Sequence, residues 1–123
     1  MYGIPSSIFP KIVNSSGDEF GECKIFPGAS IPIKCVMADQ SSSVFGSLSF
    51  KHGDVKVTLG TGAFLDVNTG SKPHASVCGI YPLVGWKTAE ETCYLAEAQS
   101  KDNGNIVEWG KSLGKLIQRL DEL

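Results

Sequence analysis

The chain has no apolar run long enough to cross a bilayer, which excludes a membrane-spanning helix as its organising element. Its opening segment, MYGIPSSIFPKIV, contains two prolines and too short an apolar stretch for a secretory signal peptide. We therefore expect a cytoplasmic protein that does not act on membranes.

Cysteine is sparse and scattered. The four cysteines, at positions 23, 35, 78 and 93, form no Cys-x-x-Cys pair, and no histidine stands at zinc spacing from them. This pattern argues against a zinc site and favours reduced thiols, so we expect no metal ligands in this chain.

An excess of either charge is also missing. The 11 basic and 13 acidic residues are well mixed and give a formal net charge of -2. Nucleic-acid binding needs a basic surface that releases counterions, and no basic stripe is present. Nucleic acid is therefore a poor candidate as a partner.

What is present is the composition of a globular segment. Of the 123 residues, 41% are hydrophobic and 20% are charged, and 14 are glycine. This length allows one domain at most, with a modest core and a small stability margin.

Residues 1–30 read as a connector with little core, because proline and glycine interrupt them repeatedly. Residues 31–38 then form an apolar run that predicts a buried strand ending at Asp39. A short helix is expected over residues 40–50, although its serine run is weak for a helix interior.

A hairpin is predicted over residues 54–68, with a glycine-bracketed turn at residues 60–62. Further strands are expected over residues 79–84 and 92–98, followed by a turn at residues 102–104. The fold class is therefore α/β or α+β, a sheet with helices.

A closing helix is predicted from apolar residues that recur at steps of three and four. Its apolar positions are Ile106, Trp109, Leu113, Leu116, Ile117, Leu120 and Leu123. Trp86 and Trp109 are both expected to be core residues, since large aromatic side chains are mostly buried.

Asp39 is the first candidate for chemistry. A carboxylate at a strand end, beside the amide of Gln40, could accept a proton from a hydroxyl group. An Asp just before a helix also commonly caps backbone N–H groups, and that explanation is preferred for the residue taken alone.

The turn Gly60-Thr61-Gly62 is the second candidate. Its missing side chains let backbone N–H groups approach a phosphate, and the Thr hydroxyl adds a donor. It lacks the length and the Lys of a P-loop, so a plain hairpin turn is the stronger explanation when it is taken by itself.

Gly104 is the third candidate, because it opens a helix whose positive end could face a nucleotide. The alternative is simply the start of an amphipathic helix.

In this order the motifs resemble the FGGY carbohydrate kinase family, and its glycerol kinase branch most strongly. The resemblance is carried by Ala38-Asp39-Gln40, by residues 53–64 (GDVKVTLGTGAF) and by Asn68-Thr69-Gly70. It extends over residues 2–5, 79–86 and 95–109, and so covers nearly the whole chain up to the closing helix.

The resemblance implies an actin-like (ribonuclease H-like) ATPase fold of two lobes, with ATP and a sugar or polyol meeting between them. Residues 1–30 would then connect from the end of the first lobe, and residues 31–123 would form part of the second lobe. Self-association of a longer form stays open.

The same resemblance implies roles for single residues. Asp39 would be the general base, and Asp39, Gln40 and Phe64 would contact the polyol. The positions expected at the nucleotide are Gly60, Thr61, Gly62, Gly104, Val107 and Glu108. Glu108 departs from the family's more usual Gln, and it brings a negative charge toward an anionic ligand.

Other parts of the family site have no counterpart here: the first phosphate loop, the acidic magnesium ligands, the substrate clamps and the adenine segment. ATP with Mg²⁺ would therefore be bound mainly by parts outside this chain, and we expect a fragment that is inactive alone. Two alternatives stay open: a non-catalytic kinase remnant that serves as an interaction module, and an unrelated small α/β binding domain.

Overall fold

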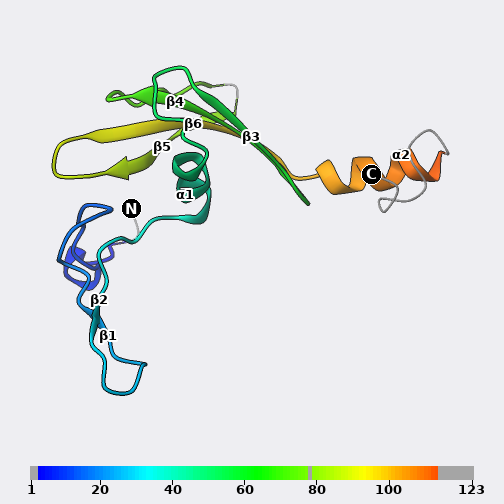
Figure 1. Cartoon of the computed structure of the whole chain (residues 1–123). Coiled ribbons are helices and arrows are strands. Elements are labelled where there is room, and N and C mark those ends of the chain that lie inside the picture. The colour runs from blue at the N-terminus through cyan, green and yellow to red at the C-terminus, as the bar shows by residue number, and fades with distance from the viewer. Residues whose placement is uncertain (1–2, 78, 114–123) are drawn as a thin grey trace.

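The computed structural model describes residues 3–77 and 79–113 (Figure 1). In chain order its elements are the 3-10 helix η1 (Ser6–Ile8), β1 (Glu22–Cys23), β2 (Ile31–Pro32), α1 (Asp39–Gly46), β3 (Val55–Leu59), β4 (Ala63–Gly70), β5 (Ile80–Lys87), β6 (Thr92–Ser100) and α2 (Asn103–Ser112).

Four of these strands form one antiparallel sheet in the order β3-β4-β6-β5. It consists of two hairpins joined along β4 and β6, so these two strands are central and β3 and β5 lie at the edges. The helix α1 packs beneath one face of the sheet, and α2 extends from its end (Figure 1). The predicted hairpin and the two later strands are all present, although β5 and β6 run further than expected.

The core lies between α1 and the strands β5 and β6. Val44 of α1 packs with Trp86, Cys93 and Leu95, and Leu95 is 0% exposed. Trp86 also meets the ring of Phe45 edge-on at a centroid distance of 5.2 Å. Burial of side chains of this size stabilises by roughly 1.5–3 kcal/mol each, so this small cluster is what holds α1 to the sheet.

The opposite face of the sheet is apolar and open. Side chains alternate between the two faces of a strand, which places Val57, Leu65 and Val84 on the face away from α1. All three are exposed. The described part of the chain therefore covers one face of its sheet and leaves the other to solvent.

The expectation of a buried strand over residues 31–38 is wrong. Only Ile31–Pro32 is a strand, and it pairs with β1 rather than with the main sheet. Further along, the N–H of Ile33 donates to the carbonyl of Gly21 and that of Val36 to Ser15. The backbone of the segment thus forms its hydrogen bonds with the N-terminal loops, and Ile31, Ile33 and Val36 stay exposed.

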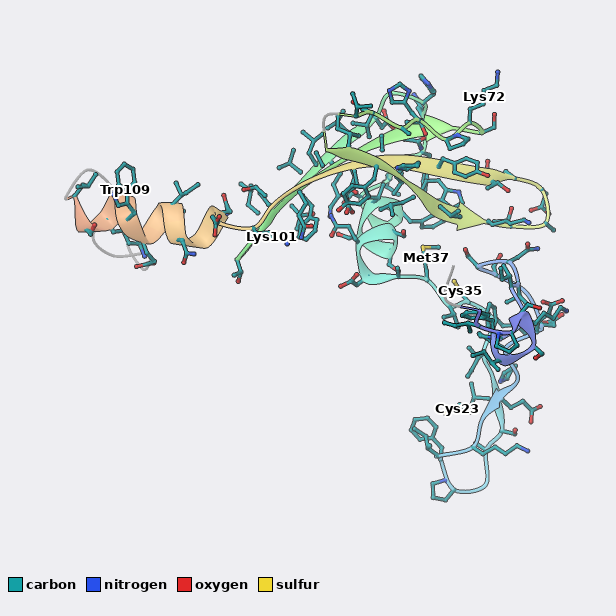
Figure 2. All side chains as sticks on the ribbon, turned by 180° about the vertical axis from the view of Figure 1, so that it is seen from behind. Cys23, Cys35, Met37, Lys72, Lys101 and Trp109 are labelled. Carbon is teal, nitrogen blue, oxygen red and sulfur yellow. The ribbon has the colours of Figure 1, made fainter. Side chains whose placement is uncertain are left out.

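The two helices also differ in part from expectation. The helix α1 ends at Gly46 instead of residue 50, because Leu48 adopts a left-handed backbone with φ 59°. Trp86 is a core residue as expected, but Trp109 is 63% exposed, so its assignment to the core is wrong. Figure 2 shows Trp109 on α2, far from the sheet. The apolar positions 116, 117, 120 and 123 lie outside the described residues.

Neither helix in the described part of the chain has the length and apolarity needed to cross a bilayer. Within the same residues, Cys23, Cys35 and Cys93 are free thiols. Burial raises the pKa of the Cys93 thiol, and the negative charge of Glu91 adds to this.

Gly85 and Leu95 provide a test of the core. A Cβ added at Gly85 would lie 2.9 Å from Cγ of Leu95, so Gly85→Ala should destabilise the chain by about 1–3 kcal/mol. Leu95→Ala should cost about 2–5 kcal/mol. Chemical denaturation of the double variant should show a loss smaller than the sum, since truncating the Leu95 side chain removes the atoms that the new methyl group meets.

Leu65→Ala is the control for this cycle, because Leu65 lies on the open face. It should cost clearly less than Leu95→Ala and add independently to Gly85→Ala. Strict additivity of Gly85→Ala with Leu95→Ala would contradict the packing described.

Candidate functional site

Asp39 is the first residue of α1, and Ala38 occupies the N-cap position without a side-chain cap bond. The Asp39 carboxylate accepts a hydrogen bond from the backbone N–H of Gln40 at 2.7 Å. It therefore lies in the first turn, where the helix dipole favours negative charge, and is not the capping residue. The side chain is exposed, so a ligand can reach it.

Gln40 ties the first turn of α1 to the sheet. Its Nε2 donates to Oγ1 of Thr58 at 2.9 Å and to Oδ2 of Asp66 at 2.6 Å. Thr58 pairs directly with Phe64 across β3 and β4, so their side chains share the face that α1 covers. The three residues expected at the polyol, Asp39, Gln40 and Phe64, are thereby gathered at one end of the hairpin.

The turn at residues 60–62 has room only for glycine at its third position. A Cβ on Gly62 would lie 2.9 Å from the carbonyl oxygen of Ser100 at the end of β6. The N–H of Gly60 also bonds across the turn to the carbonyl of Gly62 at 2.8 Å. This is a tight turn held against a neighbouring strand, which is more than a plain hairpin connection requires.

The start of α2 packs directly on this turn. The N–H of Gly104 donates to the carbonyl of Thr61, and Nδ2 of Asn103 donates to the carbonyl of Gly60, both at 2.9 Å. A Cβ on Gly104 would come within 3.4 Å of the Thr61 backbone. The structure thus brings Gly104 against the turn, and Figure 2 shows the short link at Lys101 between the sheet and α2.

Val107 and Glu108 lie further along α2, and no hydrogen bond in the described part of the chain joins either of them to the turn. Glu108 instead forms an ion pair with Lys111 at 2.8 Å. This pairing offsets the extra negative charge that Glu108 would bring toward an anionic ligand.

The two groups of residues lie at the same end of the hairpin. Gln40 contacts Thr58, which precedes Thr61 by only three residues. A strand rises by about 3.3 Å per residue, so the two positions are within roughly 10 Å along the chain. The exposed Asp39 carboxylate, next to Gln40 in the chain, and the turn at residues 60–62 are therefore both linked to the same end of the hairpin.

The sequence assigned no role to two buried carboxyl groups beside this site. Asp66 and Glu97 lie directly opposite each other on β4 and β6, and they are 1% and 6% exposed. Burial raises the pKa of Glu97; the negative charges of Asp66 and Asp39 also raise it, against a hydrogen bond from Tyr81. The sequence signal that could have found them is the position of each carboxyl group between two apolar residues in the middle of a strand.

Comparison with known proteins extends this picture. No protein-family model matches the chain. The chain is 51% identical over 115 residues to glycerol kinase 5 of Danio rerio, which covers 92% of this chain and 21% of that protein. It is 36% identical over 120 residues to the glycerol kinase of Aromatoleum aromaticum, covering 98% of this chain and 24% of that protein.

Among solved structures, the chain resembles Plasmodium falciparum glycerol kinase crystallised with ADP. The TM-score is 0.80 at 32% sequence identity, over 94% of this chain and 24% of that one. The described fold is thus part of an actin-like ATPase fold, as the sequence predicted. The homologues of the chain are glycerol kinases of the FGGY carbohydrate kinase family, and the chain spans about a fifth to a quarter of their length.

Gly62→Ala should disrupt the contact between the turn and α2, because the new methyl group cannot fit beside the backbone of Ser100. We expect a loss of about 1–3 kcal/mol and faster hydrogen exchange at the Gly104 amide, which bonds to Thr61. Gly46→Ala is the matched control, since a Cβ there meets nothing within 4 Å. Unchanged exchange at Gly104 in Gly62→Ala would show that the turn does not hold α2.

Proposed function

We propose that this chain supplies the general base and one phosphate-binding turn of an ATP-dependent, cytoplasmic polyol kinase with a glycerol-like substrate. The observation that carries the proposal is the pair of hydrogen bonds from Gln40 to Thr58 and Asp66, which holds Asp39 at the turn end of the β3–β4 hairpin. The glycerol kinase homologues support it.

In this proposal Asp39 accepts the proton of the attacking substrate hydroxyl, which makes the oxygen a better nucleophile. Gln40 and Phe64 hold the rest of the polyol. Proximity does much of the work in phosphoryl transfer, so a base fixed on the first turn of a packed helix suits the role.

ATP supplies the phosphoryl group that is transferred. The turn at residues 60–62 fits phosphate because its backbone is not shielded by side chains at Gly60 and Gly62, and Thr61 adds a hydroxyl. Gly104 brings the start of α2 beside it, and Val107 and Glu108 would line the nucleotide further along. Among residues 3–77 and 79–113, no group of three or more His, Cys, Asp or Glu side chains could hold a metal ion, and in this proposal the magnesium ligands come from elsewhere in the kinase.

Residues 1–30 would then lead out of one lobe of the kinase, and residues 31–123 would form part of the other. The relatives are four to five times longer than the segment matched, since it covers 21–24% of them. Most of the charge neutralisation that phosphoryl transfer needs would come from that remainder.

The isolated chain should therefore phosphorylate glycerol at no rate above background. A coupled ADP-release assay with glycerol, ATP and Mg²⁺ measures this, with intact P. falciparum glycerol kinase as the positive control. Turnover by the 123-residue chain alone would overturn the division of labour proposed.

The role of Asp39 can be tested in a chimera in which this chain replaces the matching segment of P. falciparum glycerol kinase, with junctions chosen on the structural superposition. We expect the chimera to phosphorylate glycerol, and Asp39→Asn to lower kcat by about 10²- to 10⁴-fold because the proton acceptor is lost. ADP affinity should be unchanged, since Asp39 is not among the residues expected at the nucleotide.

Asp54→Asn is the matched control, because that carboxylate accepts the N–H of Lys51 in a loop before β3. It should leave kcat within a few fold of the parent chimera. Full activity of the Asp39→Asn chimera would refute the role of general base.

The second candidate function is a non-catalytic interaction module. One observation favours it: the exposed apolar face formed by Val57, Leu65 and Val84, which would be buried on association with another polypeptide surface. A folded chimera that binds ADP but never phosphorylates glycerol would favour this module over the kinase.

A further inference from the structure

Asp66 and Glu97 form a buried pair of like-charged groups in the middle of the sheet. Their positions pair across β4 and β6, so both side chains stand on the face that α1 covers. In residues 3–77 and 79–113, no lysine, arginine or histidine forms an ion pair with either carboxyl group. Two adjacent buried carboxylates that form no ion pair cannot both ionise cheaply in such a place.

The hydrogen bonds around the pair leave one buried oxygen, Oδ1 of Asp66, without a donor in the described part of the chain. Oδ2 of Asp66 accepts from Nε2 of Gln40 at 2.6 Å, and Oε1 of Glu97 accepts from the hydroxyl of Tyr81 at 2.7 Å. Oδ1 of Asp66 is buried and has no partner among the described residues. A buried oxygen without a donor is unfavourable, so a proton on the facing carboxyl group would remove this penalty.

We propose that Asp66 and Glu97 hold a single proton between them, with Glu97 donating to Oδ1 of Asp66, and that this pair positions Gln40 for the substrate. Burial raises the pKa of Glu97, and the negative charge of Asp66 is among the further causes that raise it. The hydrogen bond to Glu97 likewise raises the pKa of Tyr81.

The charged and titratable groups that surround the Asp66–Glu97 pair lie on α1, β3 and β5. Asp39 on α1 adds negative charge that favours the protonated form of Glu97. Lys56 on β3 is the direct cross-strand neighbour of Asp66, but its ammonium group donates to the hydroxyl of Thr58 and, within the described ranges, forms no ion pair with either carboxyl group. Tyr81 on β5 donates to Glu97 and remains a neutral donor. The surroundings therefore favour one proton on two carboxyl groups.

The consequence for Gln40 follows from its two acceptors. Asp66 and Thr58 both accept hydrogen bonds from Nε2 of Gln40, so the amide nitrogen of Gln40 faces the sheet. The carbonyl oxygen of Gln40 is then presented as an acceptor for a substrate hydroxyl. The contact between Gln40 and a substrate hydroxyl rests on the proposed function, whereas the shared proton does not. Asp66 and Glu97 are positioning residues, since they act through Gln40.

The sign of the pH dependence is fixed by the raised pKa of Glu97. The folded chain binds this proton more tightly than the unfolded chain, whose Glu has the ordinary value of 4.5. The stability that the proton contributes is therefore present below pH 4.5 and is lost as pH rises from there through the folded value. Glu97→Gln, which keeps a donor for Asp66 and an acceptor for Tyr81, should remove this dependence.

The shared proton can be measured on the intact chain, labelled with ¹³C at the Asp and Glu side-chain carboxyl carbons. An NMR pH titration should show one carboxyl group of the pair with its pKa above 4.5, and Glu97→Gln should abolish that titration step. Glu19→Gln, at an exposed ion pair with Lys11, is the control and should leave it in place. Ordinary titration of both Asp66 and Glu97 in the unmutated chain would overturn the proposal, whatever the variants do.

The positioning role is tested in the glycerol kinase chimera. Asp66→Ala should raise KM for glycerol by about tenfold with ADP affinity unchanged, because Gln40 loses an acceptor. Asp66→Asn should restore KM, since its carbonyl oxygen can still accept from Gln40. An unaltered KM in Asp66→Ala would refute the positioning role. An inactive parent chimera would count against the proposed function, while the NMR result would still decide the shared proton.

Discussion

The packing of α1 on strands β5 and β6 determines where Asp39 and Gln40 lie. Val44 seats the helix on Leu95 and Trp86, and this contact places the first turn of the helix over the β3–β4 hairpin. Gln40 then reaches Thr58 and Asp66 at hydrogen-bond distance, with Asp39 beside it. Without that apolar contact an eight-residue helix would have little stability of its own, and the position of the Asp39 carboxylate relative to the sheet would not be fixed.

A second contact, between the turn and α2, depends on the absence of side chains. Gly62 lies so close to Ser100 that a methyl group there would press on its carbonyl oxygen at 2.9 Å, and a methyl group on Gly104 would come into van der Waals contact with the Thr61 backbone at 3.4 Å. Close backbone approach is what a phosphate-binding turn needs, and it also fixes the start of α2. The same glycines thus serve packing and the proposed nucleotide site, so their loss would affect both.

Local pattern predicted much of this fold. The hairpin around residues 60–62, the two later strands and both helices were expected and are present, because alternation and turn residues act over a few positions. The apolar run at residues 31–38 was misjudged, since pattern shows that a segment can be buried but not which neighbour takes its hydrogen bonds. The prediction that Trp109 is a core residue was wrong for a similar reason, because an apolar residue on a helix face is buried only where another surface lies against it.

By itself the sequence determined the element types, because these depend on residues close together in the chain. It also indicated the kinship with glycerol kinases, and with it the candidate base and turn, because several motifs follow one another along the chain in the family's order. Only the tertiary structure decided that Asp66 and Glu97 face each other, that they adjoin Gln40, and that one sheet face is open. Asp66 and Glu97 are 31 positions apart, and their pairing depends on how β4 and β6 come into register. Strand register is set by packing over the whole sheet, which no local pattern records.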